Sequence, residues 1–219
     1  MYNLKGLLVL GLLIINSSCD FFYKKNKDNF KEYFEYYDTG EIEIKCNVLE
    51  NKHKTGDCSY YDKNGVLLSY TEWNDGKQNG LFKSFYSSGI IKEKSFFKDG
   101  LAEGVSLHYY KNGALKVKAN YLNNLQHGSL TLFFENGTVF QESKYIEGKL
   151  SGVVYIYIYH ENNKLKEKTN WKEGKMNGDI SFFDIQGNLT AEGKMRENQK
   201  CGLWIFYDKK GNVIDKTTY

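Results

Sequence analysis

The chain has 219 residues, of which 16% are aromatic and 21 are glycine, and it contains no proline. This composition favours many short strands joined by tight turns over a helical bundle. The formal net charge is only +3, without a clustered basic stripe, which argues against a nucleic-acid-binding protein.

The N-terminus has the pattern of a secretory signal. Lys5 supplies a positive charge, and an apolar run covers residues 6–15. This run is shorter than the ~20 residues that a transmembrane helix needs, but it has the length of a signal-peptide core. Ser17 and Ser18 directly precede Cys19. This arrangement resembles a bacterial lipobox, in which the cysteine is acylated and becomes the mature N-terminus.

We therefore expect residues 1–18 to be a signal peptide and Cys19 to be the lipidation site. Residues 19–30 would form a polar tether that holds the folded part off the membrane. Asn16 occupies a position where the lipobox usually has leucine. Ordinary cleavage nearby and an uncleaved anchor therefore stay open as alternatives. The predicted location is the bacterial cell envelope, lipid-anchored and facing away from the cytoplasm.

From residue 31 to residue 219 the sequence repeats itself with a period close to 24 residues. Eight copies begin near residues 31, 56, 80, 104, 128, 152, 178 and 202, and all but the first open with glycine. A second glycine follows nine positions after most starts. Twenty positions after the start stands a Gly or an Asn, residues that tolerate positive φ and predict a turn. These residues are Asn51, Gly76, Gly100, Asn124, Gly148, Gly174 and Asn198, where Gly174 fits once a two-residue insertion in the first turn of its copy is allowed for.

Side chains repeat with the glycines. An aromatic residue stands five positions after each start, at Tyr36, Tyr61, Phe85, Tyr109, Phe133, Tyr157, Phe183 and Tyr207. In the second half of each copy, a small residue lies two positions before a large one. The small residues are Cys46, Thr71, Ser95, Ala119, Ser143, Thr169 and Gly193. Because two positions along a strand share one face, we expect each small side chain to pack beside its large neighbour.

The segments 80–89 and 202–207 carry a glycine, an apolar residue and a pair of aromatic residues at fixed spacing. This pattern resembles the bacterial variant of the MORN repeat, and the resemblance covers residues 31–219. It implies protein–protein contacts and membrane-proximal scaffolding. Proteins with this variant are often named antitoxins of the YwqK family, so an antitoxin or immunity-type role is implied as well.

The predicted fold is all-β, an elongated and curved antiparallel meander of about eight tandem β-hairpin repeats. Two short strands and two turns fill each copy and leave no room for a helix. About sixteen strands at ~4.8 Å spacing would span roughly 75 Å. Such a long sheet must twist and curl, and each copy packs only against its neighbours.

Three cysteines follow the lipidation site, Cys46, Cys58 and Cys201. Secretion would permit disulfides, but three cysteines cannot all pair within one chain. The favoured interpretation treats all three as small apolar strand residues. The alternative is a pairing of Cys46 with Cys58, which lie in adjoining repeats.

We expect no catalysis, no cofactor and no metal. The sequence contains no nucleophile elbow, Walker loop or zinc-protease motif, and its carboxylates are scattered over turns. The four histidines lie in different copies, at His53, His108, His127 and His160.

The predicted function is therefore a non-catalytic envelope lipoprotein that acts as a protein-binding repeat scaffold. Its partner would be a toxin or an envelope component, and the N-terminal lipid would attach the protein to the membrane. Tyr155, Tyr157 and Tyr159 alternate along one strand and are the candidate contact residues, because tyrosine commonly anchors protein interfaces. The alternative function is a structural or glycan-binding cell-surface module, since aromatic side chains can stack on sugars.

Overall fold

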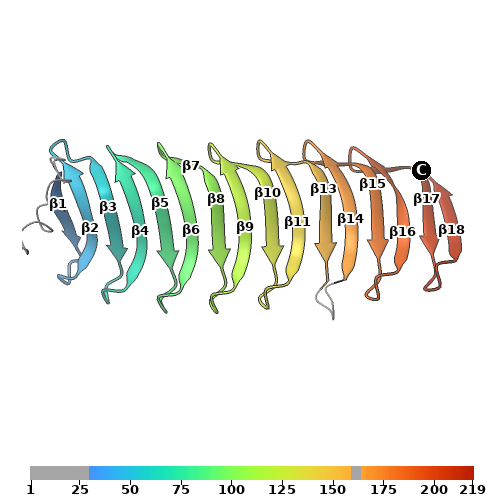
Figure 1. Ribbon diagram of the computed structural model, residues 1–219, viewed down its shortest axis with the longest axis horizontal. Coiled ribbons are helices and arrows are strands. Elements are labelled where there is room, and N and C mark those ends of the chain that lie inside the picture. The colour runs from blue at the N-terminus through green and yellow to red at the C-terminus, as the bar shows by residue number, and fades with distance from the viewer. Residues whose placement is uncertain (1–29, 159–163) are drawn as a thin grey trace, which may run out of the picture.

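The computed structural model describes residues 30–158 and 164–219, which form one sheet of eighteen antiparallel strands. Apart from two short strands described below, each strand pairs with the strand that follows it in the chain, so the sheet is a simple meander from β1 at one end to β18 at the other (Figure 1). No helix occurs among these residues. The predicted all-β meander is confirmed.

The strands are short and regular. They are β1 (Phe30–Tyr36), β2 (Ile42–Leu49), β3 (Lys54–Tyr61), β4 (Leu67–Asn74), β5 (Lys77–Phe85), β6 (Ile91–Lys98), β7 (Leu101–Ala102), β8 (Gly104–Tyr109), β9 (Leu115–Leu122), β10 (Leu125–Phe133), β11 (Val139–Ile146), β12 (Lys149–Leu150), β13 (Gly152–Tyr157), β14 (Leu165–Lys172), β15 (Lys175–Phe183), β16 (Leu189–Arg196), β17 (Gln199–Tyr207) and β18 (Val213–Thr218).

The difference between eighteen strands and the expected sixteen has a local cause. In two copies the first strand is interrupted, so that β7 and β8 both pair with β6, and β12 and β13 both pair with β11. The interrupting residues are Glu103 and Ser151, whose backbone N–H groups still donate to the preceding strand, at Phe96 O and Lys144 O. The eight-hairpin plan is therefore intact.

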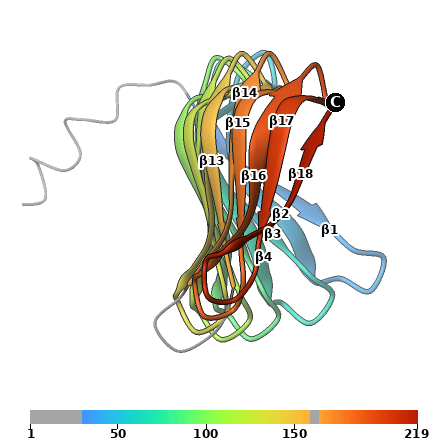
Figure 2. The ribbon, with the colours of Figure 1, turned by 90° about the vertical axis from the view of Figure 1, so that its right-hand side faces the viewer.

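The sheet is curved, as its length requires. Figure 2, which looks along the row of strands, shows that the strands are bowed and that the first strands are rotated relative to the last. No helix in the part of the chain that the structure describes is long and apolar enough to cross a membrane.

The turns between copies are two-residue hairpin turns in which both central residues have positive φ. In the turn after β4, Asp75 has φ 44° and Gly76 has φ 78°, the geometry of a type I′ turn. The same pair of left-handed residues recurs at 99–100, 123–124, 147–148, 173–174 and 197–198. The predicted turn positions are confirmed there.

The prediction for the turn after β2 is wrong. There the left-handed residue is Lys52, with φ 66°, and not Asn51. The side-chain Oδ1 of Asn51 instead accepts a hydrogen bond of 3.0 Å from the backbone N–H of His53. This local bond fixes the turn in a different way from the other copies.

The turns within copies also join one repeat to the next. Three tyrosines donate a hydrogen bond from their hydroxyl group to a backbone carbonyl in the following copy. These bonds join Tyr37 to Tyr61 (2.7 Å), Tyr86 to Tyr109 (2.7 Å) and Tyr110 to Phe133 (2.8 Å). Neighbouring hairpins are thus linked at their tips as well as along the strands.

The buried core is a single line of side chains that crosses the middle of the strands, which we call the central row. It consists of Cys46, Cys58, Thr71, Phe82, Ser95, Ser106, Ala119, Leu130, Ser143, Val154, Thr169, Ile180, Gly193 and Trp204. Every buried residue among those described lies in this row, apart from Ala191. The predicted small residues are therefore the centre of the core, and Gly193 is covered by the Trp204 ring.

Two cysteines of the central row form a disulfide. Cys46 and Cys58 are directly opposite each other on β2 and β3, and their Sγ atoms are bonded at 2.01 Å. The favoured interpretation of three unpaired cysteines is wrong for this pair, because the strand register places the two side chains face to face. Cys201 is free, as that interpretation expected.

Candidate functional site

The predicted tyrosine contact site lies on the face of the sheet opposite the central row. Val154 belongs to the central row, so its neighbour Tyr155 points to the other face, directly opposite Glu142 on β11. The Tyr157 hydroxyl donates a hydrogen bond of 3.0 Å to the Glu142 carboxylate. Burial, together with Glu142, raises the pKa of Tyr157 to about 12. Tyr159 lies outside the described residues.

Hydrogen bonds from tyrosine to carboxylate recur on this face in other copies. The Tyr70 hydroxyl donates to Asp57 at 2.7 Å, and burial followed by Asp57 raises the pKa of Tyr70. Tyr207 donates to Glu192 at 2.6 Å. The bond made by Tyr157 is thus a repeated structural feature, and the side chains of both Tyr155 and Tyr157 are half-buried.

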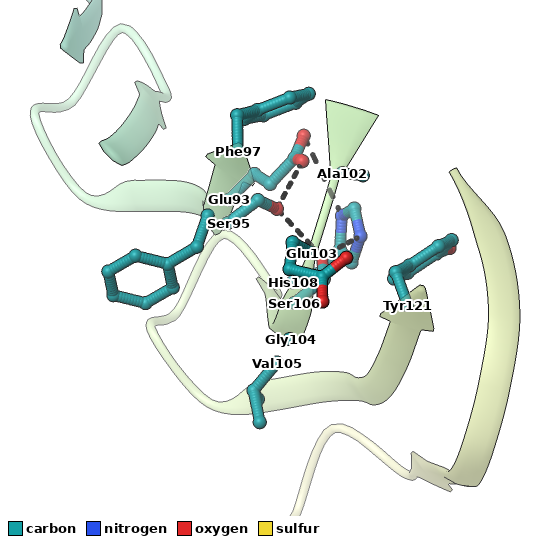
Figure 3. Close-up of a pocket in the computed structure, with 11 residues that line it drawn as sticks. Glu93, Ser95, Phe97, Ala102, Glu103, Gly104, Val105, Ser106, His108 and Tyr121 are labelled. Carbon is teal, nitrogen blue, oxygen red and sulfur yellow. Dashed lines mark hydrogen bonds and ion pairs between the residues drawn. The ribbon is translucent and has the colours of Figure 1, made fainter. Parts of the chain in front are cut away.

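A second candidate site is a cavity of about 130 Å³ between β6 and β8 (Figure 3). Four of its polar lining side chains come from these two strands. Glu93 and Ser95 come from β6, Ser106 and His108 come from β8, and Glu93 is directly opposite His108. The other lining residues are Phe96, Phe97, Ala102, Glu103, Gly104, Val105 and Tyr121.

The four polar side chains form a ring of contacts. Ser95 Oγ donates to Glu93 Oε1 at 2.7 Å and lies 2.8 Å from Ser106 Oγ. Ser106 Oγ is 3.2 Å from His108 Nε2, and His108 Nδ1 is 4.0 Å from Glu93 Oε2. The dashed lines in Figure 3 trace this ring.

The direction of proton donation follows from the carboxylate. Ser95 uses its single hydroxyl proton to donate to Glu93, so Ser95 accepts a hydrogen bond from the Ser106 hydroxyl. Ser106 then accepts a hydrogen bond from the N–H at His108 Nε2. A serine nucleophile needs the opposite arrangement, in which its hydroxyl donates to the imidazole. In this arrangement each serine hydroxyl donates toward the carboxylate and not toward the imidazole.

Ser95 and Ser106 belong to the central row and are only 4% and 5% exposed, so one side of the ring is buried in the core. From the sequence no role was predicted for these side chains, because the four histidines lie in different copies. A signal was present, because Glu93–Ser95 and Ser106–His108 each alternate on one strand face. Only the register between β6 and β8 brings the two pairs together.

Metal binding finds no support in this cavity. No group of three or more His, Cys, Asp and Glu side chains that could hold a metal ion occurs in residues 30–158 and 164–219. Two of the other histidines make separate contacts, since His53 lies 2.7 Å from Asp75 and His127 Nδ1 lies 3.5 Å from the backbone nitrogen of Glu147.

The repeats can be compared with known families. The family model of the MORN repeat variant matches residues 78–99, 102–123, 126–147 and 156–173. Four repeats of this chain match the MORN repeat variant. These matched repeats include Ala102, Ser106 and His108 of the cavity and Tyr157 of the predicted contact site, whereas Tyr155 lies just before the fourth match. The copies outside the matches continue the same strand pairing toward both ends of the sheet.

Solved structures show only distant similarity. One is a chain of a structure described as a GtfA/B complex bound to UDP and GlcNAc, with 12% sequence identity and a TM-score of 0.22 over 52% of this chain. The present chain spans 24% of that chain. Another is a protein with unknown function from Bacteroides fragilis NCTC 9343, with 7% identity, a TM-score of 0.13 and coverage of 90% and 96% of the two chains. A comparison with curated proteins finds no match.

Proposed function

We propose that this protein is a non-catalytic scaffold that binds another protein through its repeat sheet. The observation that carries the proposal is the architecture itself, a single elongated layer whose buried residues are almost confined to the central row. Repeat sheets of this kind offer long surfaces for contact with a partner. The family match to the MORN repeat variant supports the same role.

Large apolar side chains are exposed along the whole sheet and do not single out one contact region. Between residues 78 and 147 they are Phe96, Leu101, Val105, Leu122, Leu125 and Ile146. Others are exposed toward the two ends of the sheet, such as Tyr36 and Ile214. A partner that lies along several repeats would cover such scattered side chains together.

We further propose that the scaffold is an envelope lipoprotein anchored through Cys19, with a toxin or an envelope component as its partner. The Cys46–Cys58 disulfide supports an oxidising compartment, because such bonds are rare in reducing cytosol. The predicted signal peptide and lipidation site lie outside the described residues. Mass spectrometry of the mature N-terminal peptide tests them, and an unacylated N-terminus would refute the anchor.

The experiment for the binding role is affinity capture of the full-length protein from its own envelope fraction, followed by rebinding with the purified partner. We expect one protein to rebind saturably at a fixed stoichiometry. Recovery of lipid alone would refute the proposal. Glycan-array binding without a protein partner would instead support the surface-module alternative.

A further inference from the structure

One repeat position differs between the ends and the middle of the sheet. It lies two residues before the opening glycine of each copy, and we call it the pre-glycine position. In order along the chain it is occupied by Lys54, Gln78, Ala102, Gln126, Leu150, Met176 and Lys200. Lysine stands there in the second and the last copy, and alanine, the smallest of these side chains, stands only in the fourth.

In the second copy the lysine places its ammonium group over aromatic rings. Lys54 Nζ lies 5.1 Å from the centre of the Tyr60 ring and 5.2 Å from that of Trp73. It also donates a hydrogen bond of 3.0 Å to the Tyr60 hydroxyl oxygen. Cations are attracted to aromatic faces at such distances.

The last copy repeats this arrangement. Lys200 Nζ lies 4.3 Å from the centre of the Trp204 ring, 4.7 Å from that of Tyr219 and 5.8 Å from that of Phe206. Phe206 and Tyr219 correspond to Tyr60 and Trp73, because both pairs lie four and seventeen positions after the opening glycine. Two copies of the repeat therefore hold an ammonium group against the same two positions.

In the fourth copy these two positions hold His108 and Tyr121, and the pre-glycine position holds Ala102. All three residues line the 130 Å³ cavity, and Figure 3 shows them around it. The cavity is thus bounded by the same three repeat positions that hold the lysine and the two aromatic rings in the second and last copies. A methyl group replaces the lysine side chain that fills this part of the second and last copies.

The cavity is also suited to a positive charge. Two carboxylates line it, from Glu93 and Glu103, and no lysine or arginine does. Glu93 Oε1 accepts a bond from Ser95, and the nearest nitrogen of His108 is 4.0 Å from Oε2, which is too far for a hydrogen bond. Glu93 Oε2 is therefore able to accept a hydrogen bond from an incoming ammonium group.

We propose that this cavity binds the ammonium group of a lysine side chain presented by the partner protein. The inference rests on the proposed function, since it states the chemistry by which the partner is recognised. The ammonium would be held by Glu93 and the Tyr121 ring, in the place that the chain's own lysines occupy in the second and last copies.

The test uses the purified protein as cells produce it, labelled with ¹³C at its alanine methyl groups. The chain contains four alanines, Ala102, Ala114, Ala119 and Ala191, so each methyl signal is readily assigned. The probe is n-butylammonium, which reproduces the end of a lysine side chain, and neutral n-butanol is the matched control. We expect n-butylammonium to shift the Ala102 signal saturably while the Ala191 signal stays constant. An equal effect of n-butanol at Ala102, or no saturable shift with n-butylammonium, would overturn the proposal.

Variants locate the effect. Ala102→Lys should abolish binding of n-butylammonium, observed at Ala119, which is directly opposite Ser106. Met176→Lys introduces lysine at the same position of another copy and should leave binding unchanged. Glu93→Gln should weaken binding about tenfold, the effect of losing one charge-assisted hydrogen bond. If Ala102→Lys does not fold, Ala102→Met fills the cavity with the residue that the seventh copy uses.

The outcomes separate this inference from the proposed function. A partner that binds wild type and Ala102→Lys equally would refute the lysine cavity and leave the scaffold role intact. Binding of n-butylammonium at Ala102 without any protein partner would support the cavity and refute the scaffold role.

Discussion

Replacing Gly193 with alanine should destabilise the C-terminal end of the sheet. A Cβ atom at Gly193 would lie 2.6 Å from Cγ of Trp204, inside van der Waals contact. Trp204 is 2% exposed and its ring contacts Phe182, Phe206 and Tyr219, so it has little room to move. Overpacking of a core side chain costs ~1–3 kcal/mol, and we expect about 2–3 kcal/mol here.

The assay is urea denaturation followed by far-UV circular dichroism, with hydrogen exchange to locate the effect. Because repeats interact only with their neighbours, faster exchange should be confined to β16, β17 and β18. The double variant Gly193→Ala with Trp204→Leu should recover most of the loss, since it reproduces the opposed pair Ala119–Leu130 of an earlier copy. A Gly193→Ala protein as stable as wild type would refute this account of the central row.

Three further predictions concern individual bonds. Reducing the Cys46–Cys58 disulfide should lower the free energy of unfolding by about 3 kcal/mol, because the bond removes the entropy of an open loop from the unfolded chain. Denaturation with and without reductant measures this loss, and equal stability would contradict the prediction. Because the pKa of Tyr157 is raised to about 12, the Tyr157 hydroxyl of the folded state keeps its proton above pH 10. The contribution of Tyr157 to the free energy of unfolding should therefore be lost as the pH rises from 10 to about 12. Tyr157→Phe should flatten this part of the pH–stability profile, and an unchanged profile would contradict the prediction. Tyr110→Phe should cost ~1 kcal/mol by removing the bond to the next repeat, and thermal melting that matches wild type would show that the bond is dispensable.

The sequence predicted the hairpin repeat well because its signals are local. Glycine and asparagine at fixed spacing report the left-handed turn residues directly, and alternation along a strand reports which side chains share a face. The prediction that Asn51 is the left-handed turn residue was wrong. The Asn51 side chain accepts a hydrogen bond from the His53 backbone N–H, and the left-handed residue is Lys52. Such a bond competes with the usual turn and leaves no periodic signal.

The disulfide and the cavity depended on contacts between strands. Cys46 and Cys58 meet because β2 and β3 align them directly, and a one-residue change of register would place them on opposite faces. The cavity depends on the register between β6 and β8 and on the small side chain of Ala102. Residue types alone report neither register nor empty volume. The disulfide was therefore only an alternative at the level of the sequence, and the cavity emerged only from the structure.

The central claim is that the repeat sheet binds a protein partner. Titration calorimetry of the full-length protein with the partner purified from its envelope fraction tests it most directly. The account predicts a saturable heat of binding at fixed stoichiometry that is lost in Ala102→Lys and kept in Met176→Lys. The absence of any saturable protein partner would contradict it.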